Sequence, residues 1–232
     1  MTRLVYAVDV TATMISIARV TETEDGNPVP ELAMVPVPPA STFTPLATWK
    51  RASTMADKAM EKISSRGQRP DLVVIAKQLW KEPKTDSSAQ RRMAIQALLE
   101  DRLHRAGVPV AEVPYATALS WMSGHTPRDK RGILGHLEDV VNETWGLETP
   151  TFTTPGDQEK RYPYRLGVVA LAAMGTMALG VDTAVPVSTE RLAMLTSARN
   201  QAMQWPPEFK PPSTITEWHT RHEAGAPARA AG

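Results

Sequence analysis

The order of apolar segments predicts an α/β fold: a mixed five-stranded sheet with helices on both faces, followed by a C-terminal helix and a proline-rich arm. Three short apolar runs come first and are joined by short turns, so they pair antiparallel. Two later runs alternate with long helical segments, and a strand–helix–strand connection demands parallel pairing. With 232 residues, 42% of them hydrophobic, the chain is large enough to bury such a core.

Three strands are expected in the first part of the chain, at residues 4–8, 14–20 and 32–37. The first is an apolar run that ends in Asp9, and the second alternates partly with period two. Asp25-Gly26 is a hairpin signal between the second and the third. Prolines 36, 38 and 39 stop the third strand, because proline has no N–H to donate to a ladder.

The middle of the chain alternates helices and strands. We expect a helix over 45–65, a strand over 72–75, a helix from Ser87 or Ser88 to Arg105, a strand over 108–113, and helices over 114–122 and 129–146. The continuous apolar run 72–75 is typical of a strand covered on both faces. Helical spacing places Leu46 and Trp49 on the apolar side of the first helix, and we expect Trp49, Trp121 and Trp145 in the core.

The last third begins with a Thr- and Pro-rich linker over 147–157. A helix over 163–179 is apolar on every side, which indicates a buried central helix. Its apolar stretch of about 16 residues is too short to span a bilayer, so no membrane partner is expected. Another helix is expected over 188–204, and the proline-rich end is expected to be extended or disordered. The expected organisation is a domain over 1–182, an added helix over 183–204 and an arm over 205–232.

Composition excludes several classes of function. Lys and Arg number 26 against 25 Asp and Glu, so the net charge of +1 gives no global attraction for nucleic acid. The chain has no cysteine, which excludes a disulfide scaffold, a thiolate metal site and a cysteine nucleophile. No Walker-type glycine loop occurs. No secretory signal is evident at the start, and we expect a cytoplasmic or virion location.

Five segments carry a resemblance to a known family: Tyr6–Asp9, Asp71–Ile75, Ala106–Pro114, Gly124–Lys130 and Arg165–Ala173. In this order they resemble the ribonuclease H-like fold, and within it the RuvC-type Holliday-junction resolvases and their phage relatives, over about residues 3 to 180. The resemblance implies phosphodiester hydrolysis with two Mg²⁺ ions about 4 Å apart, held by carboxylates that converge at one edge of the sheet.

Only one of the acids that the resemblance implies is present. Asp9 matches the first, whereas Ala76, Tyr164 and Gly167 stand where the family carries the others. One carboxylate cannot hold two divalent ions. We therefore expect no catalytic residues and no cofactor, with Asp9 a relic. Asp9 would be a metal ligand, for Mg²⁺, only if the chain is active.

Two functions from different classes follow. The preferred one is a catalytically degenerate RuvC-like binding or structural module, such as a capsid-associated phage virion component, that docks on another protein through its arm. The docking residues would be Trp205, Pro206, Pro207, Phe209, Pro211, Pro212 and Trp218. The partner would be a viral structural protein or a second copy of the chain in a dimer.

The alternative is a RuvC-like Holliday-junction resolvase, or a junction-binding protein, that acts on branched DNA with Mg²⁺. An active resolvase requires at least three carboxylates close to Asp9, whereas an inactive junction binder requires binding that weakens steeply with salt. Phosphate contacts would come from Arg128, Lys130 and Arg131. The opposing interpretation is that nearby acids such as Asp129 neutralise these cations on an ordinary surface.

Overall fold

A computed structural model describes residues 2–23, 28–37, 42, 44–65, 67–78, 88–124, 132–154, 158–196 and 203–225. Its main sheet has the strand order β3-β2-β1-β4-β5. The strands are β1 (Leu4–Val10), β2 (Met14–Thr21), β3 (Glu31–Pro36), β4 (Leu72–Lys77) and β5 (Val110–Pro114). Strands β1, β2 and β3 pair antiparallel, and β4 pairs parallel with β1 and β5. The predicted mixed five-stranded sheet is confirmed; the turn expected at Asp25-Gly26 lies outside the described residues.

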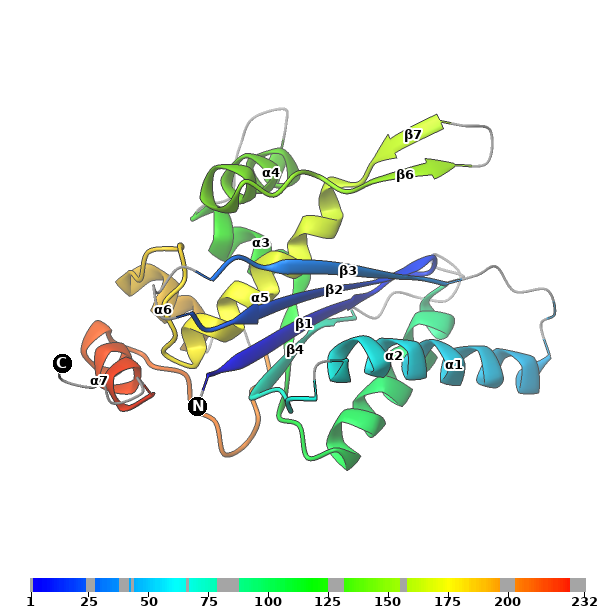
Figure 1. The fold of residues 1–232 in the computed structure, drawn as a ribbon, viewed down its shortest axis with the longest axis horizontal. Helices are drawn as coiled ribbons and strands as arrows, with labels where there is room; N and C mark the ends of the chain where they lie inside the picture. The colour runs from blue at the N-terminus through cyan, green and yellow to red at the C-terminus, as the bar shows by residue number, and fades with distance from the viewer. Residues whose placement is uncertain are drawn as a thin grey trace.

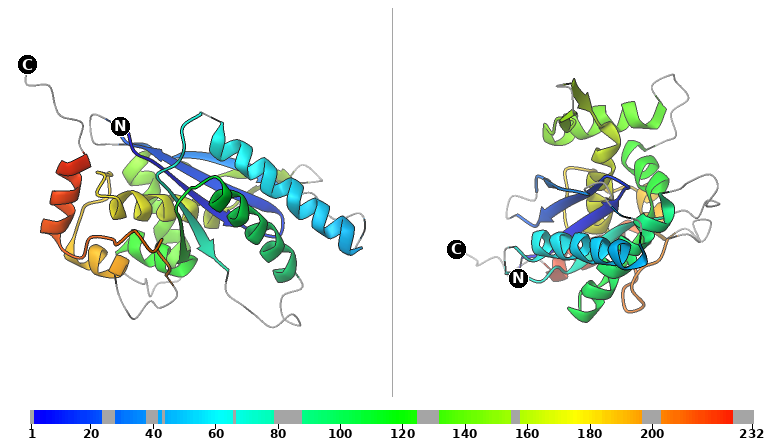
Figure 2. Two further views of the ribbon diagram at one scale, coloured as in Figure 1. Left: turned by 90° about the horizontal axis from the view of Figure 1, so that it is seen from below. Right: turned by 90° about the vertical axis from the view of Figure 1, so that its right-hand side faces the viewer.

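Helices cover both faces of this sheet. They are α1 (Pro45–Ser64), α2 (Ala89–Arg105), α3 (Tyr115–Ser123), α4 (Gly132–Trp145), the 3-10 helix η1 (Pro163–Leu166), α5 (Gly167–Ala178), α6 (Thr189–Thr196) and α7 (Ile215–Gly225). Helices α1 and α2 lie on one face, while α5 lies on the other with α3 and α4 beyond it (Figures 1 and 2). Alternate residues of each strand point to opposite faces, so Val8 and Ile75 pack toward α1 and α2, and Ala7 and Val74 toward α5.

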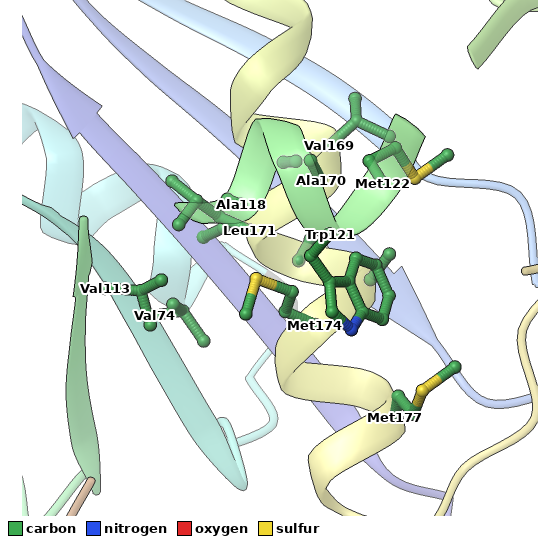
Figure 3. Packing of buried hydrophobic residues seen from close by; sticks show 14 of the residues in the cluster. Val74, Val113, Ala118, Trp121, Met122, Val169, Ala170, Leu171, Met174 and Met177 are labelled. Atoms are coloured by element: carbon green, nitrogen blue, oxygen red, sulfur yellow. The ribbon is translucent and has the colours of Figure 1, made fainter. Parts of the chain in front are cut away.

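Helix α5 is the centre of the larger core. Every one of its residues is buried, as its uniformly apolar sequence predicts. Its backbone lies close to the sheet at Gly175, where an added Cβ would be 2.6 Å from Cγ2 of Val74. On its other side Trp121 of α3 lies beside Met174 (Figure 3). Any larger residue at 175 would push the helix off the sheet.

The Thr- and Pro-rich segment 147–157, expected to be a linker, instead begins a hairpin. Strands β6 (Thr151–Thr154) and β7 (Gln158–Arg161) pair antiparallel and form a small second sheet. Threonine is β-branched and favours strands, so composition typical of a linker also suits a short hairpin. The hairpin leads into η1 and thus sets the direction from which the chain enters α5 (Figure 1).

The proline-rich end also contains regular structure, helix α7, where an extended or disordered arm was expected. A variant of the capping box starts this helix: Thr214 Oγ1 accepts a hydrogen bond from the backbone N–H of Glu217, and the Glu217 carboxylate accepts one from the N–H of Ser213, the residue before the cap. That signal is present in the sequence and was missed. Helix α6 ends at Thr196, and residues 197–202 of the predicted helix lie outside the described residues.

The division of the chain at residues 182 and 204 stays a prediction. The contacts add one fact to it, since Leu192 and Leu195 of α6 and Trp218 of α7 belong to the same buried cluster as α5.

One prediction about the core is wrong. Leu46 and Trp49 are 62% and 58% exposed, whereas Met55 and Ile63 further along α1 are buried. The first turns of α1 extend past the end of the sheet (Figures 1 and 2), so no strand lies beneath them to cover the apolar side chains. Helical spacing finds the apolar side of a helix and does not show where the neighbouring layer ends. Trp121 is fully buried and Trp145 packs against the same core, as predicted.

Candidate functional site

The edge of the sheet where β1 and β4 end is called here the Asp9 edge. Asp9 is the last but one residue of β1, and its side chain faces α5 because it alternates with that of Val8. The register pairs Val8 with Ile75, so the next pair along brings Asp9 beside Ala76. Gln78 and Arg92 close this edge from the side of α2. Gln78 Nε2 donates to the Val10 carbonyl at 2.9 Å, and Arg92 Nε donates to Gln78 Oε1 at 3.0 Å.

Asp9 is a buried carboxyl with a perturbed titration. It is 9% exposed, and burial raises its pKa to about 6. The positive charges of Arg165 and then Arg92 oppose this shift without cancelling it. Desolvation thus outweighs the two guanidinium charges in the pKa of Asp9.

Arg165 supplies the cation next to Asp9. Although it is an arginine, only 3% of it is exposed. Its Nη1 donates to Ser16 Oγ at 3.1 Å and its Nη2 to the hydroxyl of Tyr164 at 3.2 Å, and its guanidinium lies over the rings of Tyr162 and Tyr164. Helix η1 turns the chain so that residue 165 points inward. Arg165 is therefore a buried cation and not part of the surface of the chain.

Tyr115 occupies the space next to Gly167. A Cβ added to Gly167 would lie 2.0 Å from the Tyr115 hydroxyl oxygen and 2.1 Å from the carbon that carries it. Burial, and then the charge of Asp9, raise the pKa of Tyr115, so the phenol stays protonated. The position where the resemblance implies an acid is thus filled by a phenol that arrives from α3.

These residues do not fit a pair of divalent metal ions. Mg²⁺ requires several oxygen ligands. Four positions correspond to the acids of the family, and Asp9 carries a carboxylate whereas Ala76, Tyr164 and Gly167 do not. Within the described ranges, no group of three His, Cys, Asp or Glu residues is placed to hold a metal. The guanidinium of Arg165 already supplies positive charge beside Asp9. Glu82, Asp86 and Asp129 lie outside the described residues.

The candidate phosphate contacts Arg128, Lys130 and Arg131 also lie outside the described residues. A different set of cations is described at the Asp9 edge. Both α1 and α2 follow strands that end at this edge. Helix α2 follows β4. Helix α1 follows β3, and just after β3 the Val37 N–H donates to the Thr13 carbonyl, in the turn after β1, at 2.8 Å. The first half of each helix, 45–54 and 89–97, carries two cations and no acid: Lys50, Arg51, Arg91 and Arg92.

The residues predicted to dock on a partner lie along one segment, 203–225, that folds back on the chain itself. Gln204 pairs with Glu112 at the edge strand β5, and the Trp205 indole donates to the Leu195 carbonyl at 3.0 Å. Trp205 and Phe209 pack against the core cluster, Pro206, Pro211 and Pro212 are buried, and Pro207 is exposed. Trp218 is 2% exposed. A role for this segment in binding another protein stays a prediction.

Helix α7 and the N-terminal segment cap the far end of α5. Four successive carbonyls accept hydrogen bonds from side chains: Met177 from Trp218 (3.0 Å), Ala178 from Arg221 (2.9 Å), Leu179 from Arg3 (2.6 Å) and Gly180 from the His222 ring (3.0 Å). The last carbonyls of a helix have no partner within it, and cations near them are favoured by the helix dipole. The segment therefore completes α5.

Comparison with known proteins gives structural likeness alone. No protein-family model matches the chain, and no curated protein is significantly similar to it. The structure of RuvC from Thermus thermophilus matches with a TM-score of 0.50 at 16% identity, covering 73% of this chain and 90% of that one. The yeast mitochondrial Holliday junction resolvase Ydc2 matches with a TM-score of 0.50 at 14% identity, covering 85% of this chain and 82% of that one.

The chain thus has the RuvC-like ribonuclease H-like fold, as its sequence predicts. Identities this low show the fold, and activity has to be argued from the residues at the Asp9 edge. In the part of the chain that the structure describes, no helix is long and apolar enough to cross a membrane.

Proposed function

We propose that this chain binds branched DNA at the Asp9 edge and does not cut it by a two-metal mechanism. One of its structural neighbours is a Holliday junction resolvase, which suggests the class of ligand. The observation that carries the proposal is the separation of charge along α1 and α2. Their first halves hold four cations and no acid, whereas Asp57, Glu61, Glu100 and Asp101 all come later in the same helices.

This separation gives a local basic edge on a chain that is close to neutral. The helix dipoles add to it, because the positive ends of α1 and α2 are both at the Asp9 edge. Phosphates neutralised by such cations release counterions, so affinity falls as salt rises, with a slope of about 0.9 per phosphate contact on a double-logarithmic plot. Four contacts predict a slope of about −3.6.

The proposal is tested by fluorescence anisotropy with a labelled four-way junction and a linear duplex over a range of salt. We expect tighter binding to the junction, and a salt slope that falls by about 2 in the double variant Lys50→Ala/Arg91→Ala. The matched control is Lys58→Ala/Lys62→Ala, which removes two exposed lysines from the second half of α1 and should leave the slope unchanged. Equal effects of the two variants, or absent binding, would contradict the proposal.

The absence of two-metal cleavage is tested separately. Incubation of the junction with the protein and Mg²⁺ or Mn²⁺ should give no product on a denaturing gel. Cleavage that is lost in Asp9→Asn would overturn this half of the proposal and leave DNA binding intact. It would also require that acids from outside the described residues complete the site.

A structural role in a phage virion has weaker support. That role requires apolar residues of the C-terminal segment that are free to contact a partner. In the structure Trp205, Phe209 and Trp218 pack against the core of this chain instead. A viral protein partner, a dimer, and a cytoplasmic or virion location stay predictions.

A further inference from the structure

Two large apolar side chains are exposed together at the start of α1. Leu46 and Trp49 are three residues apart, so they lie on the same side of the helix, and each is more than half exposed. The other large exposed apolar residues of the described chain, Val29 and Ile215, lie in different elements. Exposing an indole to water costs free energy that a partner can recover.

The surroundings of this pair are basic. Lys50 and Arg51 follow Trp49 directly, and the first half of α1 has no acid. Burial and then the charge of Arg91 lower the pKa of Arg51, so the cations of α1 and α2 lie near one another here. An aromatic face bordered by cations is the combination that binds unpaired nucleotides, with bases stacked on the ring and phosphates on the cations.

The positive charge around Leu46 and Trp49 also indicates which kind of molecule binds to them. A second copy of the chain would bring the same cations against each other, which disfavours a symmetric contact here. A polyanion with flat apolar faces matches both features. The first turns of α1, which carry Trp49, extend past the sheet on the side where β1 and β3 end (Figure 1).

We propose that Trp49 stacks on an unpaired base where the strands of a branched DNA separate, with Lys50 and Arg51 on the adjoining phosphates. This rests on the proposed binding of branched DNA and narrows it to DNA with unpaired bases at the branch point. Leu46 extends the apolar surface beneath the same nucleotide.

The test uses the full chain and junctions with 2-aminopurine at the branch point, either fully paired or with two unpaired nucleotides. Stacking on the indole should quench the 2-aminopurine fluorescence in the wild type. Trp49→Ala should weaken binding to the junction with unpaired nucleotides about 10-fold, in the range measured for base–aromatic stacking, and change duplex binding by less than 2-fold. Trp49→Phe should retain most of the affinity, since it keeps an aromatic face, and Trp49→Leu should not.

The control variant is Ile215→Ala, which removes an exposed apolar side chain from α7 and should change neither affinity nor quenching. Because Trp49 is exposed, its variants should melt at the wild-type temperature. If the wild type binds junctions and Trp49→Ala binds them equally well, this inference fails and the proposed function stands. If the wild type binds no DNA, both fail. If Trp49→Ala abolishes self-association of the chain, the patch is a contact between copies and the inference is overturned.

Discussion

The two ends of α5 are closed by this chain's own side chains in opposite ways. At the N-terminal end, Asp9, Arg165 and Tyr115 are buried polar groups. At the C-terminal end, side chains from residue 3 and from α7 reach the last carbonyls. The first arrangement buries charge at a cost in free energy, whereas the second gives the carbonyls at the helix end further hydrogen-bond donors. One helix thus supports both a site whose expected ligands are replaced and a contact that holds the end of the domain together.

The largest effect is expected at the C-terminal end. Trp218→Ala removes a fully buried indole and its hydrogen bond to Met177, and should lower the free energy of unfolding by about 4 kcal/mol. Urea denaturation measures it, with Trp49→Ala as a matched control that removes an exposed indole and should cost less than about 0.5 kcal/mol. Similar losses in the two variants would show that α7 does not contribute to the core.

At the N-terminal end of α5, the contribution of Asp9 to the free energy of unfolding should depend on pH. The pKa of Asp9 is raised to about 6, so the folded chain holds a proton that the unfolded chain has released between about pH 4 and pH 6. Stability should therefore fall as pH rises through this window, by at most about 3 kcal/mol. Urea denaturation of the wild type and Asp9→Asn, compared at each pH, isolates the contribution of Asp9.

Arg165→Met sharpens the same comparison. Removing the guanidinium, the larger of the two opposing charges, should raise the pKa of Asp9 further, and ¹³C NMR of the carboxyl group measures the shift. A difference between wild type and Asp9→Asn that grows with pH, in favour of the wild type, would mean that Arg165 dominates over desolvation and that this description of the site is wrong.

The smallest expected change in the free energy of unfolding concerns Gly167. Gly167→Ala places a methyl group against the Tyr115 phenol and should cost about 2 kcal/mol through overpacking. A double-mutant cycle with Tyr115→Ala checks the cause, since the cost of the methyl group should largely vanish once the phenol is removed. A cost that persists without the phenol would assign the effect to the helix backbone.

The sequence predicts the sheet because its signals are local. The apolar runs at β1 and β4 and the helical spacing of α1 and α2 each depend on neighbouring residues, and the resemblance adds the place of Asp9. The burial of Arg165 could not be predicted in this way. The sequence shows that residue 165 is a cation, but the direction of its side chain is set by the 3-10 helix η1. Tyr115 is 52 positions from Gly167, so its contact could not be read from either segment.

The prediction of an extended or disordered arm was wrong because it, too, depends on a contact between segments far apart in the sequence. Pro- and Trp-rich composition predicts an extended docking segment, and only the capping box around Thr214 signals a helix. The surface that receives Trp218 lies on α5, forty residues earlier in the chain. The exposure of Trp49 depends on how far α1 extends past a sheet, which is a property of two elements together.

The capped carbonyls of α5 have a consequence for synthesis on the ribosome. Three of their four donors, Trp218, Arg221 and His222, are made about 40 residues after the helix itself. At about 5–20 residues per second, that delay is about 2 to 8 seconds. For that interval the end of α5 has its own backbone cap, in which the N–H groups of Gly180 and Val181 donate to the carbonyls of Met177 and Thr176, but it lacks the apolar cover that Trp218 later supplies.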